Sequence, residues 1–338
     1  MNYWQIASGS AQRDYHEAFL KYGMAFVGGD DKAATMEKIA TGDRVLLKRG
    51  LKEVIAAGVV IEREGKCGGN ADKKWLTDFD GWDLYAYCYV ERHEPEAPIA
   101  VTGLTRSTIC NVYQQQLIDL TNKLISDYPP KINNDPEPRE TNTVDYDKIL
   151  MSLIGNGLRP GAAEDLTNAF SRISMLAKYY YNNCQWEDIR EHETRTFLII
   201  PLLLAMGWAE QQIKIELAVK DRRRADVACF IKPYKRAEGV SNDDDCVLII
   251  ESKGFSQGLD YAPDQAKQYA AHFRNCKVIA VSNGFCYKIY IRETGGIFSG
   301  KPSAYVNLLK PTEEYPLNPD NVKGCLEALR LLLPSSYI

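Results

Sequence analysis

The chain has 338 residues, of which 45% are hydrophobic and 25% are charged. This composition is typical of a soluble globular protein with room for two or three domains. Because the formal net charge is −4 at pH 7, the chain has no overall basic field. Any contact with nucleic acid must therefore use local basic patches.

The first 95 residues predict a small β-rich unit. Helices and strands alternate up to Gly42, and two strands around a turn at Gly50 and a long alternating strand follow. The stretches are "YWQIASG" (3–9), "RDYHEAFLKYG" (13–23), "MAFVGG" (24–29), "DKAATMEKIATG" (31–42), "GDRVLLKRGLKEVIAAGVVIERE" (42–64) and "WDLYAYCYVERHE" (82–94). This order is typical of a compact barrel with helices packed over it.

Residues 96–184 are predicted to form a helical connector. Its segment "SDYPPKINNDPEPRETN" (126–142) has four prolines and almost no large apolar side chains, so it predicts an extended linker. The stretch after the linker has apolar residues at three- and four-residue spacing, which predicts helices.

From residue 185 to the end the pattern predicts an α/β domain with a mixed central sheet. A long helix, "EDIREHETRTFLIIPLLLAMGW" (187–208), precedes three strands, a helix, two more strands and a closing helix. The later stretches are "IKIELAV" (213–219), "ADVACFI" (225–231), "CVLIIESK" (246–253), "APDQAKQYAAHF" (262–273), "KVIAVSNG" (277–284), "CYKIYIR" (286–292) and "NVKGCLEALRLLL" (321–333).

The cysteines and the apolar runs bear on the compartment. The nine cysteines are an odd number without a CxxC pair, and several lie in apolar stretches, so we expect reduced, buried thiols. A zinc site is not expected, because none of the four histidines has ligand spacing to a cysteine pair. The chain shows neither a signal-peptide pattern nor an apolar run of membrane-spanning length. We therefore expect a cytoplasmic protein without a membrane partner.

The stretch "VLIIESKG" (247–254) runs from four apolar residues directly into Glu251, Ser252 and Lys253. Side chains alternate along a strand, so Glu251 and Lys253 point to the same side at the edge of a core, where charges are costly unless they have a role. A strand that runs out into solvent, with a weak surface pair, explains the same pattern.

Three further polar features suit the cleavage of a phosphodiester. Asp226 begins an apolar strand, Glu193 lies on the polar side of the long helix, and Gln265 and Tyr269 are four residues apart on one helical face. Asp226, Glu251 and the carbonyl of Ser252 are hard oxygen ligands of the kind that Mg²⁺ or Mn²⁺ prefers, and Glu193 would complete the metal shell. Lys253 would orient the attacking water and offset negative charge in the transition state.

The ordered set Glu193, Asp226, Glu251-Ser252-Lys253, Gln265 and Tyr269 resembles the motif of the PD-(D/E)xK nuclease superfamily. The surrounding sequence resembles the N-terminal nuclease domain of type I restriction motor subunits. This resemblance runs from "ETRTFLIIPLLLAMGW" through "DQAKQYAAHF" to "VIAVSNGFCYKIY". The resemblance covers roughly residues 185–295 and implies a restriction-endonuclease-like fold, with Gln265 in the catalytic set. Ala225, not proline, precedes Asp226, and no GxxxxGK[ST] stretch is present, so ATP-driven translocation is not implied.

Each of these residues also has a simpler interpretation. Asp226 would cap a turn, Glu193 would pair with Arg190 or Arg195 along its own helix, and the Gln265/Tyr269 face would be plain packing. The densest basic run, Arg222, Arg223 and Arg224, suits contacts to DNA phosphates beside the site, with Tyr269 as a further DNA contact. A solvated strand entry explains the arginines equally well.

The first 95 residues resemble the PUA-like superfamily, especially EVE-type readers of modified bases. The resemblance is carried by "YWQIASG", "GDRVLLKRG", "EVIAAGVVIE" and "GWDLYAYCYVE". It implies a pocket in which a base turned out of the duplex stacks between aromatic rings. The candidate aromatic residues of this pocket are Tyr3, Trp4, Tyr22 and Trp82. Ser8 and Asp30 would contact the edge of the base. Lys48 and Arg49 would contact backbone phosphates. Aromatic residues of a barrel core would give the same pattern.

Together these patterns predict a Mg²⁺-dependent DNA endonuclease of prokaryotic defence, resembling modification-dependent restriction enzymes, that cuts DNA carrying a modified base. Double-strand cleavage by a chain with one site favours a homodimer. Two alternatives stay open: a non-catalytic nucleic-acid-binding protein on a nuclease fold, and an RNA-directed reader or nuclease.

Overall fold

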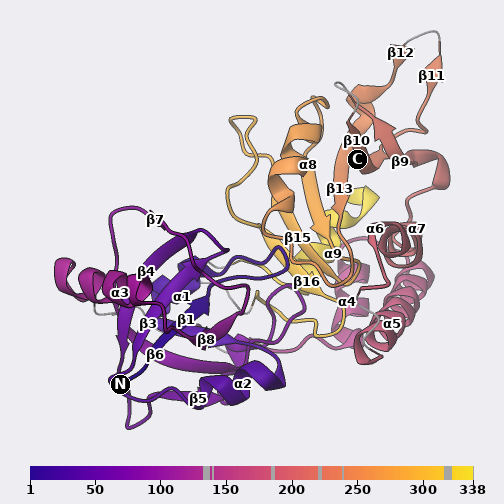
Figure 1. Cartoon of the computed structure of the whole chain (residues 1–338). Coiled ribbons are helices and arrows are strands. Elements are labelled where there is room, and N and C mark those ends of the chain that lie inside the picture. Colours follow the sequence, from indigo (N-terminus) through magenta and orange to yellow (C-terminus); the bar gives the residue numbers. More distant parts are fainter. Residues whose placement is uncertain are drawn as a thin grey trace. The chain divides into compact units, whose positions relative to one another are not determined.

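The computed structural model describes residues 1–131, 138, 141–183, 187–219, 223–237, 240–315 and 322–337. The chain divides into two compact units, Met1–Glu140 and Thr141–Ile338, which Figure 1 colours from indigo to magenta and from magenta to yellow. Both units are mixed α/β, and each contains a mixed sheet.

The first unit is built on a sheet that curves into a half-barrel. The strand order is β2-β6-β4-β3-β1-β8, with β5 paired to β6 and β7 paired to β4. Strands β1 and β3 are parallel, and the other described pairs of this sheet are antiparallel. The strands are β1 (Tyr3–Ala7), β2 (Met24–Val27), β3 (Arg44–Arg49), β4 (Glu53–Val60), β5 (Gly68–Asn70), β6 (Ala86–His93), β7 (Ile99–Ala100) and β8 (Ile109–Asn111).

Helices α1 (His16–Tyr22), α2 (Asp30–Met36) and α3 (Gln115–Asp127) complete this unit. Helix α1 ends where Gly23 takes a left-handed backbone conformation, with φ at 56°, which glycine adopts without steric cost. Helix α3 buries Leu117, Thr121 and Leu124, residues three and four apart on one face. The two leucines join the apolar cluster formed by residues of β3 and β4.

The second unit has a six-stranded sheet in the order β16-β15-β14-β13-β10-β9. Only β13 and β14 are parallel among its described pairs, and helix α8 (Ala262–Ala270) connects them and packs on both. The strands are β9 (Ile213–Ala218), β10 (Arg224–Phe230), β13 (Cys246–Ser252), β14 (Val278–Ser282), β15 (Cys286–Ile291) and β16 (Ala304–Asn307), and β11 (Arg236–Ala237) pairs separately with β12 (Val240–Ser241).

The other helices of the second unit surround this sheet. Helix α5 (Pro160–Asn182) packs against α4 (Tyr146–Gly155) and α7 (Ile200–Ala205), and α9 (Cys325–Leu332) packs on β15 and β16. Helix α6 (Glu191–Thr194) continues through a π-helical segment, Arg195–Ile199, into α7. Buried residues of the sheet and of these helices form one apolar core.

The division of the chain differs from the sequence prediction. Strands β7 and β8 pair with β4 and β1, so residues after 95 still belong to the first unit. Helices α4 and α5 contribute to the core of the second unit. The helical connector predicted for 96–184 is therefore not a separate part, because its strands pair in the first sheet and helices α4 and α5 join the core of the second unit. Most of the proline-rich linker, including 132–137 and 139–140, lies outside the described residues.

Two expectations about the environment can be compared with the structure. Cys229, Cys246, Cys276 and Cys286 are free and buried in the second unit, as the apolar context of the cysteines predicted. Within the described ranges, no helix combines the length and the apolar character needed to cross a membrane.

The turn between β14 and β15 lies close to Thr194 and Leu198, at the start of the π-helical segment. Gly284 has φ at 96°, a conformation that L side chains rarely adopt. A Cβ atom at this position would lie 2.5 Å from Leu198 Cδ1 and 2.7 Å from Thr194 Cγ2. Thr194 and Leu198 are fully buried, so neither side chain has free space into which it can move.

We predict that Gly284→Ala destabilises the protein by about 2 kcal/mol or more, because backbone strain and overpacking add. Urea denaturation measures this change. Gly295→Ala is the matched control, since a Cβ atom there meets nothing within 4 Å. Equal midpoints for the two variants would contradict the close approach at Gly284.

Candidate active site

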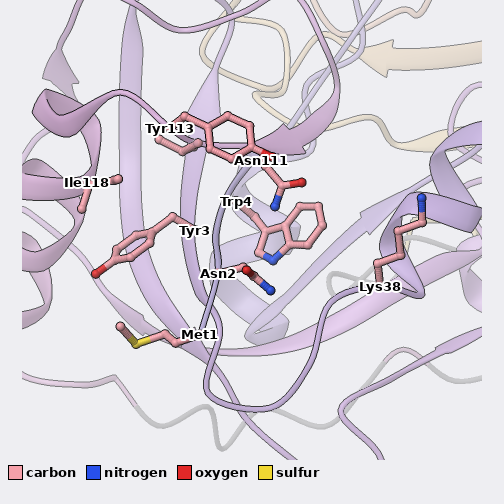
Figure 2. Close-up of a pocket in the computed structure, with 9 residues that line it drawn as sticks. Met1, Asn2, Tyr3, Trp4, Lys38, Asn111, Tyr113 and Ile118 are labelled. Atoms are coloured by element: carbon pink, nitrogen blue, oxygen red, sulfur yellow. The ribbon is translucent and has the colours of Figure 1, made fainter.

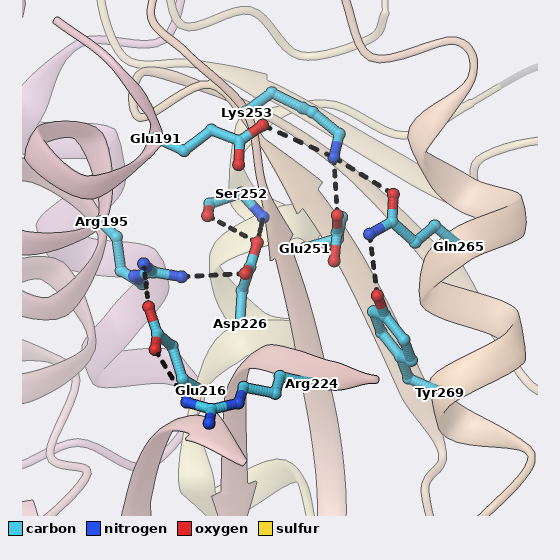
Figure 3. A network of polar contacts seen from close by, with 10 residues as sticks. All are labelled: Glu191, Arg195, Glu216, Arg224, Asp226, Glu251, Ser252, Lys253, Gln265 and Tyr269. Carbon is cyan, nitrogen blue, oxygen red and sulfur yellow. Dashed lines mark hydrogen bonds and ion pairs between the residues drawn. The ribbon is translucent and has the colours of Figure 1, made fainter. Parts of the chain in front are cut away.

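The pairing of β10 with β13 brings two carboxylates together. Val227 on β10 faces Ile250 on β13, so Asp226 and Glu251 lie one position further along each strand. Figure 3 shows their side chains at the centre of a polar cluster that also draws on the α6 helix and α8. Residues that are separated by 25 positions in the chain are thus adjacent in the sheet.

The Asp226 carboxylate accepts hydrogen bonds from three donors. Its Oδ2 atom accepts from the backbone N–H of Ser252 at 2.8 Å and from the Ser252 hydroxyl at 2.7 Å. Its Oδ1 atom accepts from Nη1 of Arg195 at 2.8 Å. These contacts hold the carboxylate in one orientation beside the end of β13.

Glu251 is the most deeply buried acidic group of the cluster. Its side chain is 2% exposed, and its Oε1 atom accepts from Nζ of Lys253 at 2.6 Å. Its Oε2 atom is buried and has no hydrogen-bond partner. Burial raises the pKa of Glu251 to about 7, the negative charge of Asp226 acts in the same direction, and Lys253 partly opposes them. The site therefore contains a buried carboxyl oxygen that nothing in the described chain satisfies.

Lys253 is held by acceptors from three elements. Besides Glu251, its ammonium donates to Oε1 of Gln265 at 3.4 Å and lies 3.8 Å from Oε1 of Glu191. Gln265 in turn donates to the hydroxyl of Tyr269 at 2.8 Å, across one turn of α8. The side chain of Lys253 is only 10% exposed, so its ammonium is fixed inside the cluster.

The acidic residue that approaches Lys253 is Glu191, not the predicted Glu193. Glu193 lies at the third position of α6, where its carboxylate accepts from the backbone N–H of Arg190 at 3.1 Å. This capping contact satisfies the start of the helix and explains why the side chain is directed there. Among the residues that the structure describes, no group of three His, Cys, Asp or Glu side chains is arranged to hold a metal ion. The predicted ligand set of Asp226, Glu251 and Glu193 is therefore not brought together.

Arg195 is the main residue of the cluster that sequence reasoning missed. Its side chain is 7% exposed and bridges Asp226 and Glu216, with Nη2 3.1 Å from Oε1 of Glu216. It begins the π-helical segment, in which the N–H of Ile200 bonds to the carbonyl of Arg195. Pro201 follows and cannot donate to the preceding turn, which favours this local widening. The sequence pattern suggested Arg195 only as a partner of Glu193 along its own helix, and its burial beside Asp226 depends on the π-helical segment.

The residues predicted to contact DNA phosphates near the site differ in their exposure and in their partners. Arg224 is exposed and lies 3.4 Å from Oε2 of Glu216, whereas Arg223 donates to Gln268 of α8. Arg222 lies outside the described residues. Tyr269 is 6% exposed, so its role as a DNA contact is not supported. Its burial makes it a support for Gln265 instead.

In the first unit, two of the predicted reader residues line a pocket. Tyr3 and Trp4 border an open pocket of about 470 Å³ together with Lys38, Asn111 and the strongly exposed Tyr113 (Figure 2). The Trp4 indole itself is 4% exposed and donates to Asp43 at 2.9 Å. The hydroxyl of Tyr3 donates to Asn122 at 2.9 Å. Trp4 is thus a wall of the pocket and also part of the core.

The other four predicted pocket residues do not line this pocket. Tyr22 is buried against Trp75, with ring centroids 5.1 Å apart, and Trp82 lies beneath the Arg13 guanidinium at 5.7 Å. Ser8 is fully buried and donates to the Lys48 carbonyl at 3.1 Å, and Asp30 accepts from the Tyr85 hydroxyl at 2.7 Å. The prediction of one pocket from all six residues is wrong for the pocket of Figure 2, because a barrel core uses aromatic side chains for packing.

The predicted phosphate contact of Lys48 is also wrong. Its side chain is 1% exposed, its ammonium donates to the carbonyl of Thr105, and burial lowers its pKa. The four successive residues of β3 from Val45 to Lys48 are all buried, so the strand is covered on both faces and Lys48 does not reach the surface. Arg49 lies near the surface but pairs with Asp14 at 2.7 Å.

No protein-family model matches this chain, and no curated protein matches it either.

The titration of Glu251 predicts an unusual pH dependence of stability in the metal-free protein. The carboxyl titrates near 4.5 when unfolded and near 7 when folded, so the folded state binds more protons between these values. Stability is then lost as pH rises from about 4.5 to 7, by a total on the order of 3 kcal/mol. Glu251→Gln should remove this loss, so the variant becomes more stable relative to wild type as pH rises. Urea denaturation with a chelator present measures both profiles, and parallel profiles would contradict the assignment.

Proposed function

We propose that this chain is a Mg²⁺-dependent DNA endonuclease that resembles PD-(D/E)xK nucleases, with a PUA-like first unit that reads a modified base. The observation that carries the proposal is the convergence of Asp226, Glu251, Lys253 and Gln265 in one cluster. The motif order predicts these four residues together with Glu193, which instead caps its own helix. A surface pair of Glu251 and Lys253 does not fit their burial.

The donor set fits a hard divalent cation. Asp226, Glu251 and the carbonyl of Ser252 offer oxygen ligands only, which Mg²⁺ and Mn²⁺ prefer. The unsatisfied Oε2 atom of Glu251 supplies a free ligand position. The negative charge of the nearby Asp226 further favours binding of a cation. When bound, Mg²⁺ holds the scissile phosphate and acidifies a water.

The other side chains then have separate tasks. The Lys253 ammonium, fixed by Glu251 and Gln265, would orient the attacking water and offset negative charge on the phosphate in the transition state. Tyr269 keeps the Gln265 amide in place. Glu251 must be ionised to act as a ligand, and a divalent cation favours that form.

The biological target belongs to the same proposal. A half-barrel with an open aromatic pocket supports a reader unit that takes up a base outside the duplex. Coupled to a nuclease, such a reader would restrict modified foreign DNA in prokaryotic defence. One cluster per chain cuts one strand, so a homodimer would deliver a double-strand break.

A second candidate is a non-catalytic DNA-binding protein on the same fold. It is favoured by the three donors that already occupy Asp226 and by the lack of a third acidic ligand in the described residues. Cleavage assays separate the two candidates.

We predict that Lys253→Ala lowers the rate of DNA cleavage by about 10²-fold or more, because it removes a group that acts on transition-state charge. The assay digests plasmid DNA carrying cytosine, methylcytosine, hydroxymethylcytosine or glucosylated bases, with Mg²⁺ or a chelator. Lys232→Ala is the control, since that side chain is 73% exposed and pairs only weakly with Asp245, at 3.6 Å. Wild-type cleavage by Lys253→Ala would exclude the assigned role.

We predict that Tyr113→Ala weakens binding of the full-length Lys253→Ala protein to modified duplex DNA more than to unmodified duplex. A stacked base contributes about 1–3 kcal/mol, which corresponds to roughly 5- to 150-fold in affinity. Tyr113 is 85% exposed, so its loss does not disturb the core, unlike the loss of Trp4. Tyr179→Ala, at an exposed tyrosine of the second unit, is the control. Equal losses on both duplexes would argue against a base-reading pocket at Tyr113.

A further inference from the structure

Four charged side chains of alternating sign connect the surface of the second unit to the carboxylate cluster. Arg224 lies 3.4 Å from Glu216, Glu216 lies 3.1 Å from Arg195, and Arg195 lies 2.8 Å from Asp226 (Figure 3). We call these four residues the charge chain. Each inner member is shared between two neighbours, so a change at one end alters the balance at the next contact.

The two residues of the charge chain nearer the surface are much more exposed than the two nearer the site. The side chain of Arg224 is 64% exposed and that of Glu216 is 49% exposed, whereas Asp226 and Arg195 are 18% and 7% exposed. The outer arginine is therefore accessible to an anion from solvent. The side chain of the inner arginine contacts both Glu216 and Asp226.

Both middle members of the charge chain lie at irregular points of the backbone. Glu216 has φ at 51° within strand β9, a left-handed conformation that is uncommon for a residue other than glycine. Around it the alternation of the strand is lost, since Ile215 is exposed and Leu217 is buried. Arg195 begins the π-helical segment. Such irregularities persist where the surroundings hold them, and they are enriched at functional sites.

Resting on the nuclease function proposed above, we infer that the charge chain couples duplex binding at Arg224 to cation binding at Asp226. A DNA phosphate draws Arg224 away from Glu216, which leaves Glu216 paired with Arg195 alone. Arg195 then shifts toward Glu216, and Oδ1 of Asp226 becomes available as a cation ligand. By thermodynamic linkage, a bound cation strengthens duplex binding by the same factor by which a bound duplex strengthens cation binding. Arg195 and Glu216 are positioning residues in this scheme.

The sequence offers a matched control for the outer arginine. Arg223 is adjacent to Arg224 and equally suited to a phosphate, but it donates to Gln268 rather than to Glu216. Loss of Arg223 should weaken duplex binding without affecting the exchange at Asp226. A comparison of Arg223→Gln with Arg224→Gln thus separates simple phosphate binding from coupling.

The test measures Mg²⁺ affinity by calorimetry with and without a saturating duplex, in the full chain carrying Lys253→Ala so that cleavage does not interfere. We expect the duplex to tighten Mg²⁺ binding by about 5-fold or more. Glu216→Gln and Arg224→Gln should reduce this factor to about one, Arg224→Lys should restore part of it, and Arg223→Gln should leave it unchanged. Glu216→Asn is a second variant at the strained position, because asparagine tolerates a left-handed backbone.

The ratio of affinities, unlike activity, does not change when a variant is merely less stable. If Glu216→Gln and Glu216→Asn keep the full duplex effect, the charge chain does not couple the two sites and the inference is overturned, while the proposed function is unaffected. If the Lys253→Ala chain binds the duplex but no Mg²⁺ under either condition, the inference and the proposed function both fail. These results are therefore distinguishable.

Discussion

The repulsion between two adjacent carboxylates, Asp226 and Glu251, is the constraint around which the second unit is arranged. Ionised acids placed side by side away from water destabilise a fold unless cations or hydrogen-bond donors surround them. Here the Asp226 carboxylate receives Arg195 and two donors of Ser252, and Glu251 receives Lys253. One oxygen of Glu251 is left without a partner. The protein thus compensates most, but not all, of the charge that it brings together.

The groups that balance the charges of Asp226 and Glu251 lie on segments that the topology of the sheet brings side by side. Strands β10 and β13 supply the acids, and the parallel pair of β13 and β14 requires a crossover connection, which includes α8 and so brings Gln265 over Lys253. The helix that begins at Glu191 supplies the inner arginine. It lies close to the turn at Gly284, where a Cβ atom has no room beside Thr194 and Leu198. A glycine at a turn far from the acids in sequence thus lies against the residues on either side of Arg195 along the helix.

The parts that sequence analysis predicted depend on short-range patterns. Strand alternation placed Glu251 and Lys253 on one side, and four-residue spacing placed Gln265 beside Tyr269, as the structure has them. The choice between Glu191 and Glu193 depends on helix phase and on a capping contact, which a motif does not encode. Lys48 was misplaced because β3 is buried on both faces, and the buried pairing of Arg195 depends on a π-turn. Helix capping, burial of a strand on both faces and a π-turn are set by the tertiary structure, and the wrong predictions fall at these positions.

The incomplete compensation of Glu251 also bears on how a nuclease of this kind would be restrained. With a pKa near 7, Glu251 is partly protonated at neutral pH in the absence of a cation, and Arg195 occupies one oxygen of Asp226. Binding a divalent cation then requires the loss of a proton and the displacement of an arginine contact, both of which reduce affinity. A site with this resting state would have few cations bound without DNA. In a nuclease of the kind proposed, the same charges would thereby limit cleavage to chains that have bound DNA.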